Sequence, residues 1–186
     1  MLKNCVIFLT LFTLVFIADQ SLKQWTLQVL CEANVVENGK IFFEEAGSML
    51  EVSTCSARKQ LFGGEYVSLV GTLNTGVAFS MFSEYKEHLK FVHLGLLVAL
   101  FLYLLWQRKF FKEHLIAFSL MFGAGFSNLL DRFLYGGVVD MFFWHKWFEF
   151  AIFNIADATI NLSIAIIVIK ELFFRKKPEK TNEWTV

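Results

Sequence analysis

The chain has 186 residues, of which 56% are hydrophobic and 23 are phenylalanine, and its formal net charge is zero. The apolar share lies above the average of about 45–50% for soluble proteins, and the balanced charge argues against a nucleic acid or another polyanion as partner. The charged residues gather in short blocks between long apolar runs. This pattern predicts a single integral membrane domain over residues 1–186.

The first apolar run predicts a transmembrane helix over residues 5–30. A basic start at Lys3 followed by apolar residues is also the pattern of a secretory signal peptide. Phe16 is bulky where signal-peptide cleavage requires a small residue, and Leu30 is bulky where a lipoprotein-type site at Cys31 requires Gly or Ala. The sequence therefore favours an uncleaved helix.

Residues 31–88 are polar and mixed, and glycines divide them into short β-like runs. These runs are residues 40–43, 49–54 and 66–73. They predict a small antiparallel sheet that lies outside the membrane or on its surface. Cys31 and Cys55 both fall in this region, where an oxidising compartment would allow them to pair; the sequence leaves open whether they do.

Three further apolar runs predict spans over residues 89–107, 114–134 and 151–174, followed by a polar tail over 175–186. Basic residues gather in the loop after the second span and in the tail, whereas the third loop holds only Lys146. The positive-inside rule places both termini and the second loop in the cytoplasm. The 31–88 region and the third loop then face outward.

Three aspartates, Asp19, Asp140 and Asp157, lie near the predicted outer ends of these spans. Ionisable groups at membrane depth are costly and usually face a functional cavity. Two carboxylates brought close together share one proton and titrate as a unit. Such a pair activates water in aspartic proteases, so Asp140 and Asp157 are candidates for a catalytic pair. The competing interpretation is that each aspartate only packs or caps a helix.

Other polar residues recur at helical spacing on the third and fourth segments. They are Asn128, Asp131 and Arg132 on the third, and Asn154, Asp157 and Asn161 on the fourth. If these segments pack antiparallel, the two polar faces meet, and Asn128 and Asn154 supply amide donors. Asp131 beside Arg132 indicates a structural ion pair or a helix-end device.

Other chemistries have weaker support. His145 and Glu149 are four residues apart, but no HExxH motif accompanies them, so we expect no metal and no cofactor. The nucleophile motif G-x-S-x-G is absent. The alternative function is a proton- or ion-coupled membrane transporter with the aspartates as a relay. Four spans without inverted repeats or broken helices argue against it. A non-enzymatic assembly factor is a third interpretation, and the intact Asp140 and Asp157 argue against that.

Five motifs in order resemble the lipoprotein signal peptidase (signal peptidase II) family. They are D-Q-S-L-K at 19–23, N-T-G-V-A-F-S at 74–80, N-L-L-D-R at 128–132, G-G-V-V-D-M-F at 136–142 and F-N-I-A-D-A at 153–158. The resemblance covers nearly the whole chain. The outward region between residues 31 and 73 is long for the family.

The resemblance implies an aspartyl endopeptidase of the bacterial cytoplasmic (inner) membrane. Such an enzyme removes the signal peptide from diacylglyceryl-modified prolipoproteins, cutting just before the lipidated cysteine. Carried onto this sequence, it makes Asp140 and Asp157 the catalytic pair. The supporting residues become Asp19, Lys23, Asn74, Gly76, Asn128, Arg132 and Asn154.

The family fold implied is mainly α, with four transmembrane helices, a small periplasmic antiparallel β-cradle and an outer loop over an active site near the outer leaflet. The resemblance also implies membrane lipid as surroundings and inhibition by cyclic peptide antibiotics of the globomycin type. Nothing in the sequence demands more than a monomer.

Overall fold

The computed structural model describes residues 2–30, 35–37, 40–45, 48–51, 54–61, 66–77 and 81–174, with side chains outside the stretch 29–65. The predicted tail over 175–186 and the side chains of Cys31 and Cys55 lie outside this part. The pairing of these two cysteines therefore stays a prediction.

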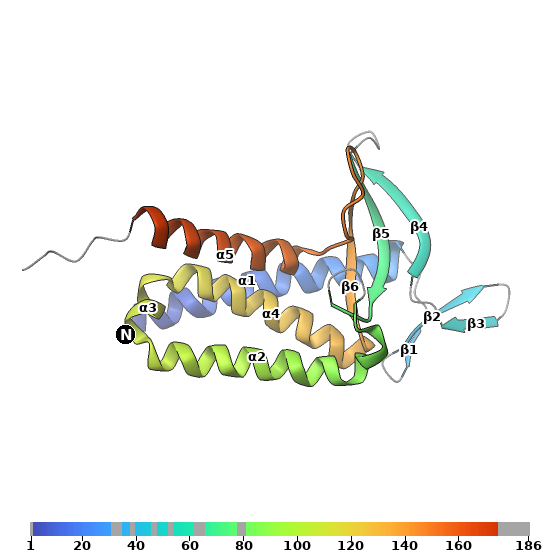
Figure 1. The fold of residues 1–186 in the computed structure, drawn as a ribbon. Helices are drawn as coiled ribbons and strands as arrows, with labels where there is room; N and C mark the ends of the chain where they lie inside the picture. The colour runs from blue at the N-terminus through green and yellow to red at the C-terminus, as the bar shows by residue number, and fades with distance from the viewer. Residues whose placement is uncertain are drawn as a thin grey trace, which may run out of the picture.

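Four long helices form the body of the described chain (Figure 1). They are α1 (Leu2–Trp25), α2 (Lys86–Trp106), α4 (Leu115–Tyr135) and α5 (Ile155–Phe173). A π-helical turn, η1 (Thr26–Leu30), extends α1, a 3₁₀ turn, η4 (Ser83–Tyr85), precedes α2, and the short α3 (Arg108–Glu113) turns the chain from α2 into α4. The four predicted helices are thus confirmed as helices. The last begins at Ile155 instead of 151, because Asn154 is extended and caps it.

The strands form two antiparallel sheets. The first has the order β1 (Val35–Glu37), β2 (Lys40–Glu45), β3 (Ser48–Glu51); the second has the order β4 (Thr54–Leu61), β5 (Val67–Asn74), β6 (Val138–Trp144). The predicted runs at 40–43, 49–54 and 66–73 overlap β2, β3 and β5. Residues 138–144 were predicted to lie in the loop between the third and fourth helices, with no strand. They form β6, since the apolar run after the turn at Gly136 pairs with β5.

The helices pack around α4 through an apolar core of Leu97, Leu104, Phe118, Phe122 and Leu129. Close approach of α1 requires a glycine on α4, because a Cβ at Gly123 would lie 2.5 Å from the carbonyl oxygen of Phe12. A second cluster joins the β4–β5–β6 sheet to the helices. It consists of Leu27, Leu69, Tyr135, Val139 and Met141. This second cluster fixes β6 against the end of α4, where the polar residues gather.

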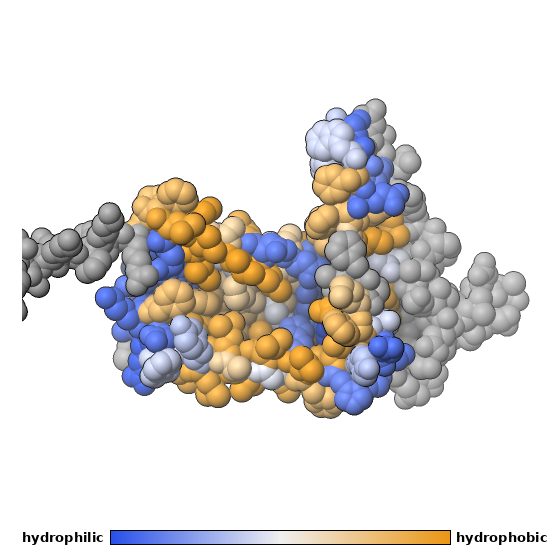
Figure 2. Space-filling model, in the orientation of Figure 1, coloured by the Kyte–Doolittle hydropathy of each residue, from blue (hydrophilic) through white to orange (hydrophobic). Residues whose placement is uncertain are grey.

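Two helical stretches of the described chain, Leu2–Gln28 and Ser83–Trp106, are long and apolar enough to cross a membrane. Their large side chains are mostly uncovered: Leu9 and Phe91 are each 60% exposed. An apolar surface of this extent is typical of contact with lipid or a partner. Figure 2 shows hydrophobic residues over the helical body, with hydrophilic residues gathered in the hollow where it meets the sheet.

Candidate active site

A cavity of about 420 Å³ opens where β6 meets α2, α4 and α5. Its polar lining includes both predicted catalytic aspartates, Asp140 and Asp157, together with Asn74, Asn128 and Arg132. Its other walls are apolar side chains of α2 and α5 and the segment 150–153 that leads into α5. The structure therefore brings the two carboxylates to one cavity, as the motif spacing predicted.

Asp140 is held by the pairing of β6 with β5. Gly136 ends α4 with a φ of 71°, a left-handed conformation that glycine adopts without strain. The next residue, Gly137, packs so closely that a Cβ there would lie 2.8 Å from the carbonyl oxygen of Asn74. This register directs the Asn74 amide to Asp140 Oδ2, at 3.1 Å, while Asn154 donates to Oδ1 at 2.7 Å. Asp140 is therefore oriented by two amides.

Burial controls the protonation of Asp140, which is only 2% exposed. Loss of hydration disfavours the ionised form, and together with the nearby charge of Asp157 it raises the pKa of Asp140 to about 7. The hydrogen bonds from Asn74 and Asn154 oppose the increase. Asp140 therefore holds a proton in slightly acidic solution.

Asp157 is the third residue of α5 and forms a capping box with Asn154. The Asn154 side-chain oxygen accepts the Asp157 backbone N–H at 2.9 Å, and Asp157 Oδ2 accepts the Asn154 backbone N–H at 3.2 Å. Asn128 on α4 donates to Asp157 Oδ1 at 2.9 Å. These two hydrogen bonds fix the orientation of the Asp157 carboxylate at the start of α5.

Asn154 is fully buried and links the two aspartates directly. Besides Asp140, its side-chain amide reaches Asn128 Oδ1 at 3.2 Å and the carbonyl of Val139 at 3.3 Å. One side chain thus fixes Asp140 from the strand and caps the helix that carries Asp157.

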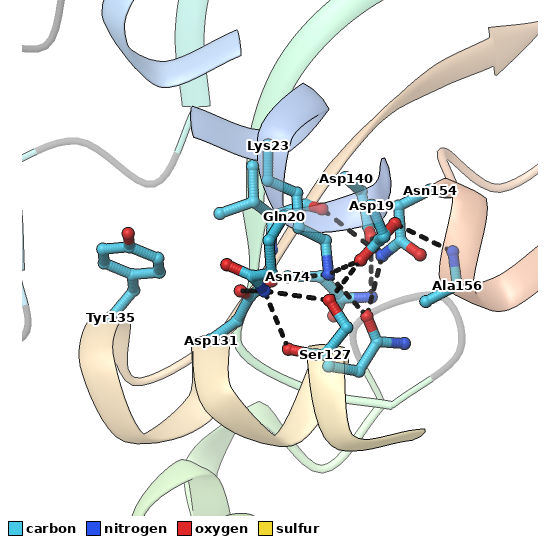
Figure 3. Close-up of polar contacts among 12 residues, drawn as sticks. Asp19, Gln20, Lys23, Asn74, Ser127, Asp131, Tyr135, Asp140, Asn154 and Ala156 are labelled. Atoms are coloured by element: carbon cyan, nitrogen blue, oxygen red, sulfur yellow. Dashed lines mark hydrogen bonds and ion pairs between the residues drawn. The ribbon is translucent and has the colours of Figure 1, made fainter. Parts of the chain in front are cut away.

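Lys23 forms a buried ion cluster close to Asp140 and Asn154 (Figure 3). Its ammonium, with no exposed surface, lies 2.6 Å from Asp19 Oδ2 and 2.8 Å from Asp131 Oδ2, and it donates to Asn128 Oδ1 at 2.7 Å. Asp19 also accepts the backbone N–H of Ala156 at 2.8 Å. The cluster therefore ties α1 to α4 and to the first turn of α5, which carries Asp157.

The predicted ion pair between Asp131 and Arg132 is wrong, although Asp131 does have a structural contact. Asp131 pairs with Lys23, because neighbouring residues on a helix point in different directions. Arg132 faces the cavity and donates from Nη2 to the carbonyl of Gly76 at 2.7 Å. Within the described residues its buried Nη1 has no hydrogen-bond partner.

The structure thus gathers every predicted site residue. Three others were missed by the sequence analysis: Gln20, Ser127 and His93. Gln20 donates to Asp131 Oδ1 at 2.8 Å, and Ser127 donates to Asp19 Oδ2 at 2.6 Å. Gln20 lies inside the D-Q-S-L-K motif. Ser127 lies four residues before Asp131, and this helical spacing places both on one face of α4. His93 lines the cavity from the apolar α2, where no pattern marks it.

His145, considered above as a metal ligand with Glu149, lies on the rim of the sheet. Its Nε2 is 2.9 Å from the hydroxyl oxygen of Ser68. This hydrogen bond gives His145 a structural contact between β5 and the segment after β6.

Comparison with known proteins decides the family. A model of the family described as signal peptidase (SPase) II matches residues 11–173. The chain belongs to the signal peptidase II family. It is therefore a peptidase that removes signal peptides from prolipoproteins, and the transporter alternative is not supported.

Individual relatives agree. A lipoprotein signal peptidase of Helicobacter pylori (strain Shi470) is 33% identical over 178 residues, which cover 96% of this chain and 94% of the relative. One from Campylobacter jejuni (strain RM1221) is 61% identical over 115 residues, which cover 62% of this chain and 74% of the relative.

Two solved structures, each described as a bacterial membrane enzyme, share the fold. One has a TM-score of 0.65 and 20% identity, covering 93% of this chain and 94% of its own. The other has a TM-score of 0.61 and 22% identity, covering 90% and 94%. The helical body with its attached sheet is therefore a fold that bacterial membrane enzymes use.

Proposed function

We propose that Asp140 and Asp157 are the catalytic pair of an aspartic endopeptidase that cuts diacylglyceryl-modified prolipoproteins just before the lipidated cysteine. The observation that carries this proposal is that both carboxylates line one cavity and are joined through Asn154.

The proton starts on Asp140 and the negative charge on Asp157. Asp140 is the more deeply buried carboxyl, whereas Asp157 lies at a helix N-terminus that favours its ionised form. Asp157 takes a proton from a water molecule as the water oxygen attacks the scissile carbonyl carbon. Asp140 donates a hydrogen bond to the carbonyl oxygen and polarises it.

Collapse of the tetrahedral intermediate breaks the C–N bond. The proton held by Asp157 passes to the leaving amine, which becomes the amino group of the lipidated cysteine, and the signal peptide leaves with a new carboxylate. Arg132, which lines the cavity, is placed to hold the peptide backbone, while the amide of Asn74 orients Asp140. Lys23 acts at a distance as a positioning residue, through Asn128 and Asp19.

We propose that all four long helices cross the membrane. The helix α4 has 21 residues and α5 has 19, which correspond to about 31 and 28 Å at 1.5 Å per residue, close to the ~30 Å hydrocarbon core. The start of α1, which carries Lys3, and the helix α3, which carries Arg108, Lys109 and Lys112, lie at the end of the body opposite the sheets (Figure 1). The positive-inside rule then places that end in the cytoplasm and the cavity near the outer leaflet.

The apolar wall of the cavity suits a lipidated substrate. Leu89, Val92 and Leu96 of α2 face Ile160 of α5 across it. We propose that the diacylglyceryl chains lie along this wall, that membrane lipid covers the exposed helices, and that a cyclic peptide of the globomycin type competes for the same space. A monomer suffices, because this chain alone supplies every group in the scheme.

The test is cleavage of a purified prolipoprotein by the purified full chain in detergent. The same prolipoprotein is supplied with and without its diacylglyceryl group, and the products are identified by mass spectrometry. We expect one cut, directly before the cysteine and only in the modified substrate, and inhibition by globomycin. Equal cleavage of the unmodified substrate, or a cut elsewhere, would reject the proposed specificity.

A further inference from the structure

A second group of ionisable side chains lies far from the cavity, where α3, α4 and the last turn of α5 meet. It consists of Glu113, His114 and Glu171, whose ligand atoms all lie within 4.8 Å of one another. Figure 1 shows α3 at the end of the helical body remote from the sheets. None of these residues takes part in the proposed peptide cleavage.

The orientation of His114 leaves one of its ring nitrogens without a hydrogen-bond donor. The His114 side chain has no exposed surface, and its Nδ1 lies 3.1 Å from the carbonyl oxygen of Phe110. A carbonyl oxygen only accepts, so Nδ1 carries the hydrogen. The lone pair of Nε2 then faces Glu171 Oε1 at 3.3 Å, and Nε2 has no hydrogen-bond partner in the described part of the chain. A buried ring nitrogen whose neighbouring atom is another acceptor needs a cation beside it: a second ring proton or a metal ion.

The geometry fits a metal ion. Two ligands on a tetrahedral zinc ion, each at about 2.0–2.1 Å, lie about 3.3–3.4 Å apart. The separation between His114 Nε2 and Glu171 Oε1 is 3.3 Å. A metal-binding histidine usually donates its other ring N–H to a carbonyl or carboxylate, which is the contact that Nδ1 makes here. Glu113 is exposed and next to His114, so its carboxylate is free to rotate toward the same point.

We propose that Glu113, His114 and Glu171 bind a divalent metal ion of the zinc class, which fastens the end of α5 to the α3–α4 corner. One imidazole and two carboxylates suit zinc, whereas calcium and magnesium prefer oxygen ligands alone. Lys170 reaches the same corner, where its ammonium donates to the backbone carbonyl of Glu113. The positive charge of Lys170 repels a bound cation, but the two negative charges of Glu113 and Glu171 exceed it.

The test is zinc binding to the purified, tag-free full chain in detergent after removal of metal with a chelator. Calorimetry gives the affinity, metal analysis gives the stoichiometry, and thermal unfolding gives the stabilisation by zinc. We expect one zinc ion per chain and a zinc-dependent rise in Tm, with no such rise from magnesium or calcium. His114→Gln and Glu171→Gln should each weaken binding at least about tenfold.

Matched variants separate this site from other ligands of the chain. His88→Gln and Glu84→Gln, at exposed positions, should bind zinc as the parent does. Lys170→Met should bind it more tightly, because the opposing charge is gone. Each Tm without zinc identifies variants that fail to fold.

If the parent protein holds no zinc after dialysis against zinc, the proposal is overturned. The contact between His114 and Glu171 is then assigned to a proton that they share. Unchanged zinc affinity in Glu171→Gln would overturn it too, and would point to the cysteines as ligands.

Discussion

Asn154 and Asp157 bond to each other twice at the start of α5. The Asn154 side chain accepts the Asp157 backbone N–H at 2.9 Å, and the Asp157 carboxylate accepts the Asn154 backbone N–H at 3.2 Å. The same Asn154 donates to Asp140 at 2.7 Å. The residue that caps α5 therefore also sets the distance between the side chains of Asp140 and Asp157.

This arrangement predicts that Asn154→Ala loses activity out of proportion to its loss of stability. The lost cap costs about 1 kcal/mol, whereas misplacement of a carboxylate by ~1 Å costs about 10²-fold in rate. The comparison is Asn154→Ser, which keeps a capping oxygen and loses the amide donor. We expect Asn154→Ser to retain the parent Tm with cleavage still impaired; parent-like cleavage would show that capping alone is needed.

The raised pKa of Asp140 predicts the pH dependence of cleavage. The pair needs one proton, so kcat/KM should fall on the alkaline side with a midpoint near the Asp140 pKa of about 7. The hydrogen bond from Asn74 lowers that pKa, so Asn74→Ala should move the alkaline midpoint to higher pH while it reduces the rate. A midpoint that stays fixed in Asn74→Ala would contradict the assignment to Asp140.

The same pKa predicts how folding stability changes with pH. Unfolded Asp140 ionises near its ordinary value of 3.8, whereas folded Asp140 keeps its proton up to about 7. Between these values the folded state binds more protons, so this group's contribution is fully present below pH 3.8 and is lost as pH rises toward 7. Asp140→Asn should flatten that part of the Tm–pH curve. An unchanged slope would mean that Asp140 is ionised throughout.

Removal of the Lys23 charge should be severe. Lys23→Met leaves Asp19 and Asp131 buried without their counter-ion, and breaking such a pair costs about 3–5 kcal/mol. The triple variant Asp19→Asn, Lys23→Met, Asp131→Asn should regain much of the Tm. Thermal unfolding in detergent measures both. If Lys23→Met unfolds at the parent temperature, the cluster has no structural role.

Gly137 should tolerate no side chain. A Cβ there would lie 2.8 Å from the carbonyl oxygen of Asn74 and 3.0 Å from Leu73, so Gly137→Ala must displace the strand that carries Asp140. We expect Gly137→Ala to lower Tm and cleavage together. The control is Gly95→Ala on α2, where a Cβ meets no atom within 4 Å. Gly95→Ala should be neutral or stabilise by up to about 1 kcal/mol, and equal loss in both variants would refute the register argument.

The long helices were readable from the sequence because each is a continuous apolar run. The polar faces were readable because Asn128 and Asp131, or Asn154 and Asp157, recur at helical spacing. Asp19 and Lys23 stand four residues apart, which places them on one helix face, and the structure pairs them at 2.6 Å.

Two features depended on distant parts of the chain and were missed. Strand β6 forms because β5, more than sixty residues earlier, offers a free edge. Its aromatic residues are equally typical of a membrane interface, so they do not mark a strand. The partner of Asp131 is Lys23, on another helix. Pairings of this kind depend on tertiary packing, which local sequence patterns do not contain.

The most direct test of the catalytic pair is single-turnover cleavage of a diacylglyceryl-modified prolipoprotein by Asp140→Asn and by Asp157→Asn. Glu84→Gln, at an exposed position, is the control, and the Tm of each variant establishes folding. We predict that each aspartate variant stays folded and loses activity by a factor on the order of 10⁴, while the control cleaves normally. A folded Asp140→Asn or Asp157→Asn that cleaves at a rate near the parent's would contradict the account.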